Sequence, residues 1–294
     1  MLLCAGFGQR LRPLTDELPK PLMPVGDRSV LEHIAQHLVQ QGQRRAVANS
    51  HWLPDALSAA AARLPLPVHV MHEPVIRGVA GGIAGARELL EAPIIAWNGD
   101  TLIDRPPLLE LFADVQHTGG ICLAVAETDG AGTLGLDEHG LVVRTRGETH
   151  GHEVKRADYV CLAGIGRDAL AELPSDGCLI GDYCLPRMRR GLPVYTRFIE
   201  GAWHDIGSLD SYLTANLLWL GAHHNHAGSS YLAPDARVSH GVQLERTVVG
   251  AGARVAGEGR VSECVIWPNT LAIAPLERAI VTPTQVVRLS PDAP

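Results

Sequence analysis

The first twenty residues contain several groups that could bind a phosphate. Gly6 and Gly8 follow a short apolar run, and Arg10, Arg12 and Lys20 come after them. Glycines that follow a strand let backbone N–H groups approach phosphate oxygens closely, because no side chain intervenes. Lys20 stands between two prolines, which stiffen the backbone that presents its ammonium group. The segment therefore predicts a site for a phosphate-bearing ligand.

Two common phosphate-binding motifs do not fit this segment. The G-x-G-x-x-G fingerprint of dinucleotide-binding folds fails because Leu11 occupies its third glycine position, and no Gly-Lys-Ser/Thr follows as a P-loop requires. Arg12 is as consistent with a surface residue as with a ligand-binding one.

Asp100 stands where a ligand could bind. It comes just after the apolar run at residues 94–97, at the carboxyl end of an expected strand, where open α/β sheets bind ligands. Taken alone, such an aspartate is more often a cap or turn residue than a metal ligand.

The composition excludes several classes of protein. Hydrophobic residues make up 46% of the 294 residues and charged residues 19%, as is typical of globular proteins. A net charge of -7 argues against a nucleic-acid surface, so an anionic ligand needs a local basic cluster. No Cys-x-x-Cys pair, signal region or apolar run of membrane length is present. We expect a cytoplasmic protein with reduced thiols and no membrane partner.

The first half of the chain alternates short apolar runs with amphipathic stretches, which indicates βαβ units. Ser29 and Glu32 form a capping-box pair before a helix that Gly42 would end. Residues 134–146 read as an antiparallel hairpin. We expect a Rossmann-like, mixed, mostly parallel sheet with helices on both faces. Its strands are expected at residues 46–50, 68–71, 94–97 and 121–126.

A second domain is expected at the C-terminus. The polar residues 222–230, with three histidines, predict an exposed linker rather than a zinc site. Beyond it, Leu232, Val238 and Leu244 recur every six residues, which predicts a short left-handed β-helix of hexapeptide-like repeats over residues 231–294. Because the repeat is short and residues 270–287 drift out of register, a few irregular surface strands are the alternative.

The motifs resemble the signature of sugar-1-phosphate nucleotidyltransferases, which join a nucleoside triphosphate to a sugar phosphate. Gly-x-Gly-x-Arg-Leu-x-Pro-Leu-Thr is followed by Pro-Lys-Pro-Leu-x-Pro-Val, and the likeness continues at residues 73–83, 98–100, 162–165 and 203–216. It covers roughly the first 220 residues, so residues 1–221 are expected to form the catalytic domain. Hexapeptide-like tails also occur in several branches of this family.

The resemblance implies a role for each basic and glycine residue of the first segment. Gly6 and Gly8 would hold the triphosphate. Arg10 would neutralise charge on the transferring nucleotidyl group and on the departing pyrophosphate. Lys20 would bridge the sugar phosphate and the α-phosphate of the nucleotide.

The resemblance also implies metal, base and sugar contacts. Asp100 and Asp205, the latter preceded by Trp203 and His204, match the acids that hold Mg²⁺ in the family. Carboxylate oxygens suit Mg²⁺, which keeps several waters. Glu73 and the backbone at Gly78 would face the base. The residues expected to line the sugar are Gly135, Glu153 and Gly164.

These expectations define an enzyme that makes a nucleotide sugar from a nucleoside triphosphate and a sugar 1-phosphate. GDP-mannose is the favoured product, and UDP- or dTDP-glucose are alternatives because Val79 replaces the threonine common in guanylyl-transferring relatives. The usual Glu-Lys-Pro is absent near Glu153, which weakens the match of Glu153 to the family's sugar-binding carboxylate. A non-catalytic regulatory homologue and, more weakly, an acyltransferase are the competing functions. Homo-oligomerisation through the C-terminal domain is a further hypothesis.

Overall fold

The computed structural model describes residues 1–223 and 228–290. The chain divides into two compact units. The first comprises Met1–Phe7, Pro19–Pro21 and His33–Trp203, and the second comprises Gly8–Leu18, Leu22–Glu32 and His204–Pro294. Residues 224–227 of the expected linker, including His224 and His226, lie outside the described residues. The domain boundaries expected from the sequence stay predictions.

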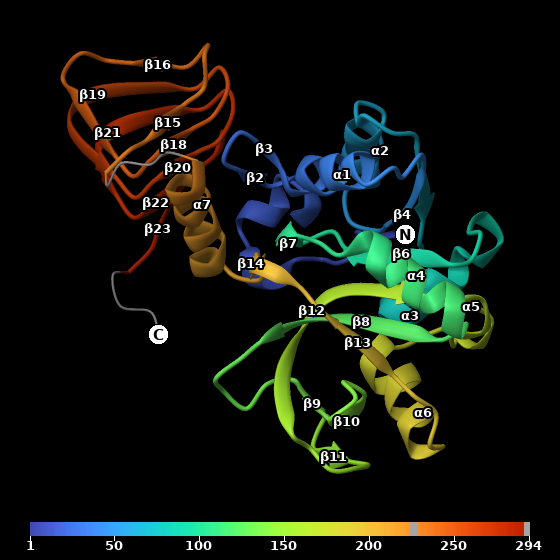
Figure 1. Cartoon of the computed structure of the whole chain (residues 1–294). Helices are drawn as coiled ribbons and strands as arrows, with labels where there is room; N and C mark the ends of the chain where they lie inside the picture. Colours follow the sequence, from blue (N-terminus) through green and yellow to red (C-terminus); the bar gives the residue numbers. More distant parts are fainter. Residues whose placement is uncertain (224–227, 291–294) are drawn as a thin grey trace. The chain divides into compact units, whose positions relative to one another are not determined.

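A ten-stranded mixed sheet forms the centre of the first unit (Figure 1). The order β11-β10-β9-β12-β6-β1-β4-β5 describes its main path; off this path, β8 pairs with β12, and β13 pairs with β8. Strands β6, β1, β4 and β5 are parallel, whereas β12 runs antiparallel to β6, β8 and β9. The strands are β1 (Leu2–Leu3), β4 (Ala46–Ser50), β5 (Val68–His72), β6 (Ile94–Asn98), β8 (Ile121–Glu127), β9 (Leu134–Leu136), β10 (Val142–Thr145), β11 (Glu148–Thr149), β12 (Lys155–Ile165) and β13 (Tyr195–Phe198).

The expected strands and the hairpin of β9 and β10 are confirmed, with small shifts at their ends. Two further two-stranded sheets are present. They pair β2 (Pro24–Val25) with β3 (Arg28–Ser29), and β7 (Thr101–Arg105) with β14 (Glu200–Asp205).

Helices cover both faces of the large sheet, as the sequence predicts. A Cβ at Gly164 in β12 would lie 2.7 Å from the carbonyl oxygen of Leu111, so β12 packs closely against α4 (Leu108–Thr118) at this residue. The neighbouring Ala163 and Ile165 belong instead to a buried cluster with Ile83 of α3 (Gly78–Gly85). Since successive residues of a strand face opposite sides, α3 and α4 lie on opposite faces. The α-helices are α1 (Val30–Gln40), α2 (Pro54–Ala61), α3 (Gly78–Gly85), α4 (Leu108–Thr118), α5 (Arg167–Glu172), α6 (Leu185–Arg189) and α7 (Leu209–His223).

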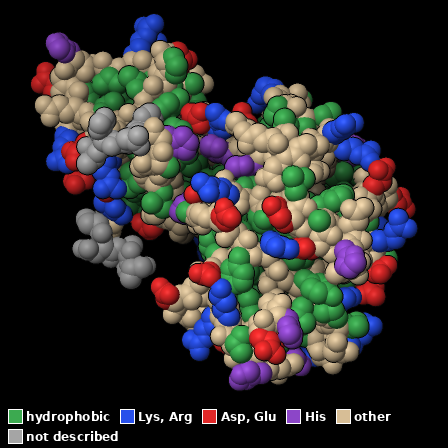
Figure 2. All heavy atoms as spheres, in the orientation of Figure 1, with side chains coloured by type: hydrophobic (Ala, Val, Ile, Leu, Met, Phe, Trp, Pro, Cys, Tyr) green, Lys and Arg blue, Asp and Glu red, His purple; other side chains and the backbone are tan. Residues whose placement is uncertain are grey.

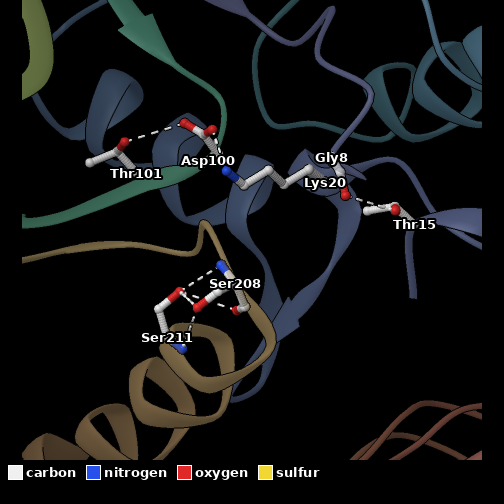
Figure 3. Close-up of polar contacts among 7 residues, drawn as sticks. All are labelled: Gly8, Thr15, Lys20, Asp100, Thr101, Ser208 and Ser211. Atoms are coloured by element: carbon white, nitrogen blue, oxygen red, sulfur yellow. Dashed lines mark hydrogen bonds and ion pairs between the residues drawn. The ribbon is translucent and has the colours of Figure 1, made fainter. Parts of the chain in front are cut away.

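The capping box before α1 is confirmed. The Ser29 backbone N–H donates to Glu32 Oε2 at 2.7 Å, and the Glu32 N–H donates to Ser29 Oγ at 3.3 Å. A similar reciprocal pair begins α7, where the Ser208 N–H donates to Ser211 Oγ at 2.8 Å and the Ser211 N–H donates to Ser208 Oγ at 3.2 Å (Figure 3). Both pairs satisfy N–H groups that a helix start leaves without intrahelical partners.

The first segment of the chain forms short helical turns instead of long elements. These 3₁₀ turns are η1 (Gln9–Leu11), η2 (Leu14–Asp16) and η3 (Lys20–Leu22). Later in the chain, η4 (Arg87–Leu89) is another 3₁₀ turn and η5 (Leu179–Cys184) is a π-helical turn.

Within the described residues, no helix combines the length and the apolar character needed to cross a bilayer.

The C-terminal strands, coloured orange to red in Figure 1, stack as parallel rungs, except that the last strand runs antiparallel to β22 (Ala279–Val281). Tyr231 pairs with Val248 and Val248 pairs with Val265, so these rungs are 17 residues apart, one fewer than three hexapeptides, whereas Val265 pairs with Ile280, 15 residues further on. Buried aliphatic residues, among them Val249 and Ile266, fill the interior. The left-handed β-helix stays a prediction. The strands are β15 (Tyr231–Leu232), β16 (Arg237–Val238), β17 (Val242–Glu245), β18 (Val248–Val249), β19 (Arg254–Ser262), β20 (Val265–Ile266), β21 (Leu271–Glu277), β22 (Ala279–Val281) and β23 (Val286–Arg288).

Candidate active site

Lys20 and Asp100 form an ion pair in the first unit. The Lys20 Nζ lies 2.6 Å from Asp100 Oδ2, and the two side chains are 12% and 28% exposed (Figure 3). Thr101 Oγ1 donates to the other carboxylate oxygen of Asp100 at 3.3 Å. The 2.6 Å contact between Lys20 and Asp100 is a charge-assisted hydrogen bond, which is strong and holds both groups in place. The partial exposure leaves the pair within reach of a ligand.

Gly99 explains why Asp100 stands where the sequence predicts, just beyond the carboxyl end of β6. The Gly99 N–H donates to the Leu3 carbonyl oxygen at 2.9 Å. A Cβ at Gly99 would lie 2.7 Å from Cys4 Sγ, so a larger residue would push β6 away from the segment that follows β1. The close approach of these two strand ends brings Asp100 to the edge where parallel sheets bind ligands.

The glycine turn is built around Gly8 in the second unit. Gly8 has a φ of 61°, a left-handed value that favours glycine, and a Cβ there would lie 2.7 Å from Thr15 Cγ2. Its carbonyl oxygen accepts hydrogen bonds from the Leu11 N–H at 2.9 Å and from Thr15 Oγ1 at 3.0 Å (Figure 3). Gly6, in the first unit, is exposed, and a Cβ there would meet no described atom within 4 Å.

Arg10 and Asp205 flank Gly207, also within the second unit. A Cβ at Gly207 would lie 2.9 Å from Asp205 Oδ2 and 3.0 Å from Arg10 Nη2. Arg10, the expected phosphate-binding cation, and Asp205, one of the expected metal-binding acids, therefore both lie beside the backbone of Gly207. Gly207 was not among the residues expected from the sequence, although it follows Asp205 by two positions. Arg12, in contrast, pairs at 3.3 Å with Asp16 on the surface, which agrees with a surface role.

The two acids expected to hold Mg²⁺ belong to different compact units, so their convergence stays a prediction. Asp100 and Asp205 both offer carboxylate oxygens, and neither side chain is buried, so the donor chemistry fits the ion. Across residues 1–223 and 228–290, no group of three or more His, Cys, Asp or Glu side chains is arranged to hold a metal. All six cysteines are free thiols.

Glu73 is a buried acid with one unsatisfied oxygen. Its side chain is 1% exposed, and its Oε1 accepts a hydrogen bond from Asn49 Nδ2 at 2.9 Å. Asn49 Oδ1 in turn accepts from the Cys4 N–H at 2.7 Å. Glu73 Oε2 has no hydrogen-bond partner among the described residues, which is costly for a buried carboxylate. Asn49 was not expected from the sequence, although a polar residue inside an apolar strand is a signal that could have indicated it.

Close packing around α3 leaves no room for a side chain at Gly78 or Gly82. Gly78 has a φ of 73°, and a Cβ there would lie 2.5 Å from the Gly177 carbonyl oxygen. That oxygen accepts a hydrogen bond from the Ala80 N–H at 3.0 Å. At Gly82, a Cβ would lie 2.7 Å from Asn49 Nδ2 and 3.1 Å from a Glu73 oxygen. The expected contact of Gly78 with a base stays a prediction.

Two of the three residues expected at the sugar lie together. A Cβ at Gly135 would lie 2.3 Å from Glu153 Oε2, so only glycine leaves room for this carboxylate. Arg144 Nε donates to Glu153 Oε2 at 2.5 Å and Arg156 Nε to Oε1 at 3.0 Å. The hydrogen bond from Arg144, and more weakly the one from Arg156, lowers the pKa of Glu153. Gly164 instead packs under α4, as described above, and Arg144 was missed.

Charged side chains of both signs are interspersed over the face shown in Figure 2. An anionic ligand on such a surface needs specific cationic contacts of the kind that Arg10 and Lys20 provide.

A scan against protein-family models identifies the class of the fold. Residues 1–220 match the family described as nucleotidyl transferase, and the chain belongs to this family. The resemblance to sugar-1-phosphate nucleotidyltransferases found in the sequence is thereby confirmed.

Curated relatives and a solved structure agree with this assignment. A mannose-1-phosphate guanylyltransferase catalytic subunit beta from Drosophila melanogaster is 27% identical over 233 residues, which cover 75% of this chain and 62% of that protein. The Danio rerio protein of that name is 25% identical, with 92% and 86% covered. This chain thus spans less than two thirds of the Drosophila melanogaster relative. The crystal structure of HddC from Yersinia pseudotuberculosis shares the fold, with a TM-score of 0.61 at 20% identity over 74% of this chain and 97% of that one.

Proposed function

We propose that this protein transfers a nucleotidyl group from a nucleoside triphosphate to a sugar 1-phosphate, with GDP-mannose the favoured product. The contact of Lys20 with Asp100 is the observation that carries the proposal. It joins, across 80 residues of sequence, the lysine expected to meet two phosphates and an acid expected to hold their counter-ion.

The reaction needs no covalent intermediate with the protein. An oxygen of the sugar 1-phosphate attacks the α-phosphorus of the triphosphate, a new P–O bond forms, and the bond to the bridging oxygen of the β-phosphate breaks. Pyrophosphate leaves with the bonding electron pair. Catalysis then consists of positioning and of stabilising charge on phosphate oxygens.

Each residue of the basic segment contributes to this charge stabilisation. The backbone N–H groups near Gly6 and Gly8 would hold the triphosphate, and Arg10 would meet charge on the α-phosphate and the pyrophosphate. Lys20 would exchange part of its contact with Asp100 for the two reacting phosphates. Mg²⁺ held by Asp100 and Asp205 would supply further neutralisation of phosphate charge.

Glu73 supports guanine as the base. A carboxylate only accepts hydrogen bonds, and guanine offers two adjacent donors, N1–H and the N2 amino group, on one edge. Uracil and thymine offer one donor between two carbonyl oxygens, which suits an amide better. The unsatisfied Oε2 of Glu73 could therefore accept from guanine. The names of the relatives, mannose-1-phosphate guanylyltransferases, favour the same base and favour mannose as the sugar.

The remaining parts of the proposal concern the sugar and the C-terminal domain. The Glu153 carboxylate over Gly135 would accept from sugar hydroxyl groups. We further propose that the C-terminal strands form a left-handed β-helix that supports homo-oligomers, and that the enzyme works in the cytoplasm. UDP- or dTDP-sugar synthesis and a non-catalytic regulatory role are the alternatives. Retention of Arg10, Lys20, Asp100 and Asp205 favours the enzyme over the regulatory homologue.

A pyrophosphate-release screen tests the proposal. Four nucleoside triphosphates are each combined with mannose, glucose and other sugar 1-phosphates, with Mg²⁺ and with excess chelator. We expect release with GTP and mannose 1-phosphate that depends on the metal. Release with UTP or dTTP alone would establish an alternative product, and no release with any pair would contradict the enzyme.

A further inference from the structure

The C-terminal strands reach the segment that carries Arg10 and flanks Lys20. Glu17 Oε1 accepts hydrogen bonds from Thr282 Oγ1, from Thr284 Oγ1 at 2.6 Å and from Gln285 Nε2 at 3.1 Å. All four residues belong to the second unit. Three donors converge on one oxygen from the turn between β22 and β23, so the C-terminal strands hold Glu17 at a defined place.

Gln285 also reaches the same segment at a second point, and Thr282 shapes the turn that presents these donors. Gln285 Nε2 lies 3.4 Å from the Pro13 carbonyl oxygen. Thr282 Oγ1 accepts from the Gln285 N–H at 3.2 Å. Thr282 is 3% exposed. The turn is thus fixed by its own hydrogen bonds before it engages Glu17.

A second anchor lies on the other side of Lys20. Tyr212 Oη donates to the Pro24 carbonyl oxygen at 2.5 Å, and Trp267 Nε1 donates to Tyr212 Oη at 3.0 Å. Tyr212 is fully buried and Trp267 is 2% exposed. Burial makes both side chains rigid, and Trp267 directly follows β20. Glu17 and Pro24, three positions before Lys20 and four positions after it in the sequence, are therefore both held within the second unit.

The anchored stretch includes Arg10. Thr15 Oγ1 and the Leu11 N–H both donate to the Gly8 carbonyl oxygen, and Leu11 and Leu14 are fully buried. These contacts make residues 8–18 one packed unit, so a restraint applied at Glu17 is transmitted to the turn that presents Arg10.

We infer that the C-terminal strands position residues 8–18, the segment that carries Arg10. Glu17 is the positioning residue, and the turn at Thr284 and Gln285 fixes it by hydrogen bonds. The inference rests on the proposed function for its catalytic consequence. The C-terminal domain then serves phosphate binding in its own chain, in addition to any role in assembly. Preorganised cations lower the cost of ordering when the triphosphate binds.

Four variants of the full chain test this inference. Thr284→Val removes the donor and keeps the shape of the side chain, and Glu17→Ala removes the acceptor. Glu17→Gln keeps an Oε1 acceptor and should restore function. Thr270→Val is the matched control, because it removes a threonine hydroxyl bond to Pro268 elsewhere in the C-terminal strands.

Amide hydrogen exchange of residues 8–18 is the first readout. We expect exchange at least fivefold faster in Thr284→Val and Glu17→Ala than in wild type, with Thr270→Val and Glu17→Gln within twofold. The Glu17→Ala, Thr284→Val double variant should be no faster than Glu17→Ala alone, since both changes remove one interaction.

Steady-state kinetics is the second readout. We expect the KM for the triphosphate to rise at least threefold in Thr284→Val and Glu17→Ala, with little change in Tm. A merely structural defect would reduce the active fraction, and thus kcat, without moving KM. Unchanged exchange and unchanged KM in both variants would overturn the inference. If wild type releases no pyrophosphate with any pair, the proposed function fails, and the exchange experiment still decides whether the C-terminal strands hold residues 8–18.

Discussion

The Lys20 ammonium lies 2.6 Å from the Asp100 carboxylate, although the two residues stand on either side of 79 intervening positions. The two charges compensate each other before any ligand is bound. A phosphate that contacts Lys20, and a cation that contacts Asp100, would take over the roles that the partners now play. The pair is therefore suited to bind an anion and a cation together.

Replacing Lys20 tests its proposed contact with the reacting phosphates. Lys20→Ala should lower kcat by at least a hundredfold, because loss of one charge-stabilising donor costs about 3 to 4 kcal/mol of transition-state stabilisation. Arg12→Ala, which removes an exposed pair with Asp16, should stay within threefold of wild type. Pyrophosphate release under saturating substrates measures both. Near-normal turnover of Lys20→Ala would remove this lysine from the mechanism.

Gly207 provides a test of the arrangement of Arg10 and Asp205. A methyl group at this position would lie 2.9 Å from Asp205 Oδ2 and 3.0 Å from Arg10 Nη2. Gly207→Ala should fold normally, since flexible side-chain ends can move, but kcat/KM should fall at least tenfold as both groups are displaced.

Gly221→Ala is the matched control for this change. A Cβ at Gly221 would meet no described atom within 4 Å, so its kcat/KM should equal that of wild type. Equal kcat/KM in the Gly207 and Gly221 variants would show that Arg10 and Asp205 need no fixed arrangement.

Glu73→Gln tests the proposed hydrogen bonding of Glu73 to a guanine base. The amide keeps an oxygen for Asn49 Nδ2 but replaces the other acceptor by a donor, which would oppose the donors of guanine. We expect kcat/KM with GTP to fall at least tenfold, with a smaller loss for UTP. The exposed Glu91→Gln is the control. A constant ratio of GTP to UTP activity would exclude Glu73 from base selection.

Buried thiols should make the fold less stable in alkali. Burial raises the pKa of Cys184 to about 12, whereas an unfolded chain releases the thiol proton near pH ~8.5. Above that pH the unfolded state binds fewer protons, so stability falls as pH rises towards 12. At pH ~10 this group alone would cost about 2 kcal/mol.

Urea unfolding at pH 7.5 and pH 10 measures this effect. Cys184→Ala should lose less stability than wild type between the two values, and the cavity that the substitution leaves cancels because it is present at both. The same direction is expected for Cys4 and Cys264, whose pKa values burial raises to about 12 and about 11. An identical loss in wild type and Cys184→Ala would show that this thiol ionises alike in both states.

Local patterns in the sequence predicted most of the secondary structure. The capping box of Ser29 and Glu32 is fixed by residues three positions apart, and apolar runs marked the strands because burial on both faces requires continuous apolar residues. The signature residues Arg10 and Lys20 were recognised from the sequence because they lie in one short segment, and their roles stay predictions.

The sequence could not show which distant residues meet, because contacts across the fold depend on strand order and packing. Asn49 joins Cys4 to Glu73 only because β4 lies beside β1. A side chain at Gly207 would disturb the site only because Arg10 and Asp205 approach this residue in the folded chain. The hold on Glu17 by Thr284, 267 positions later, likewise exists only in the folded chain. Local chemistry thus determined the kinds of groups in this protein, and tertiary packing decided which of them act on one another.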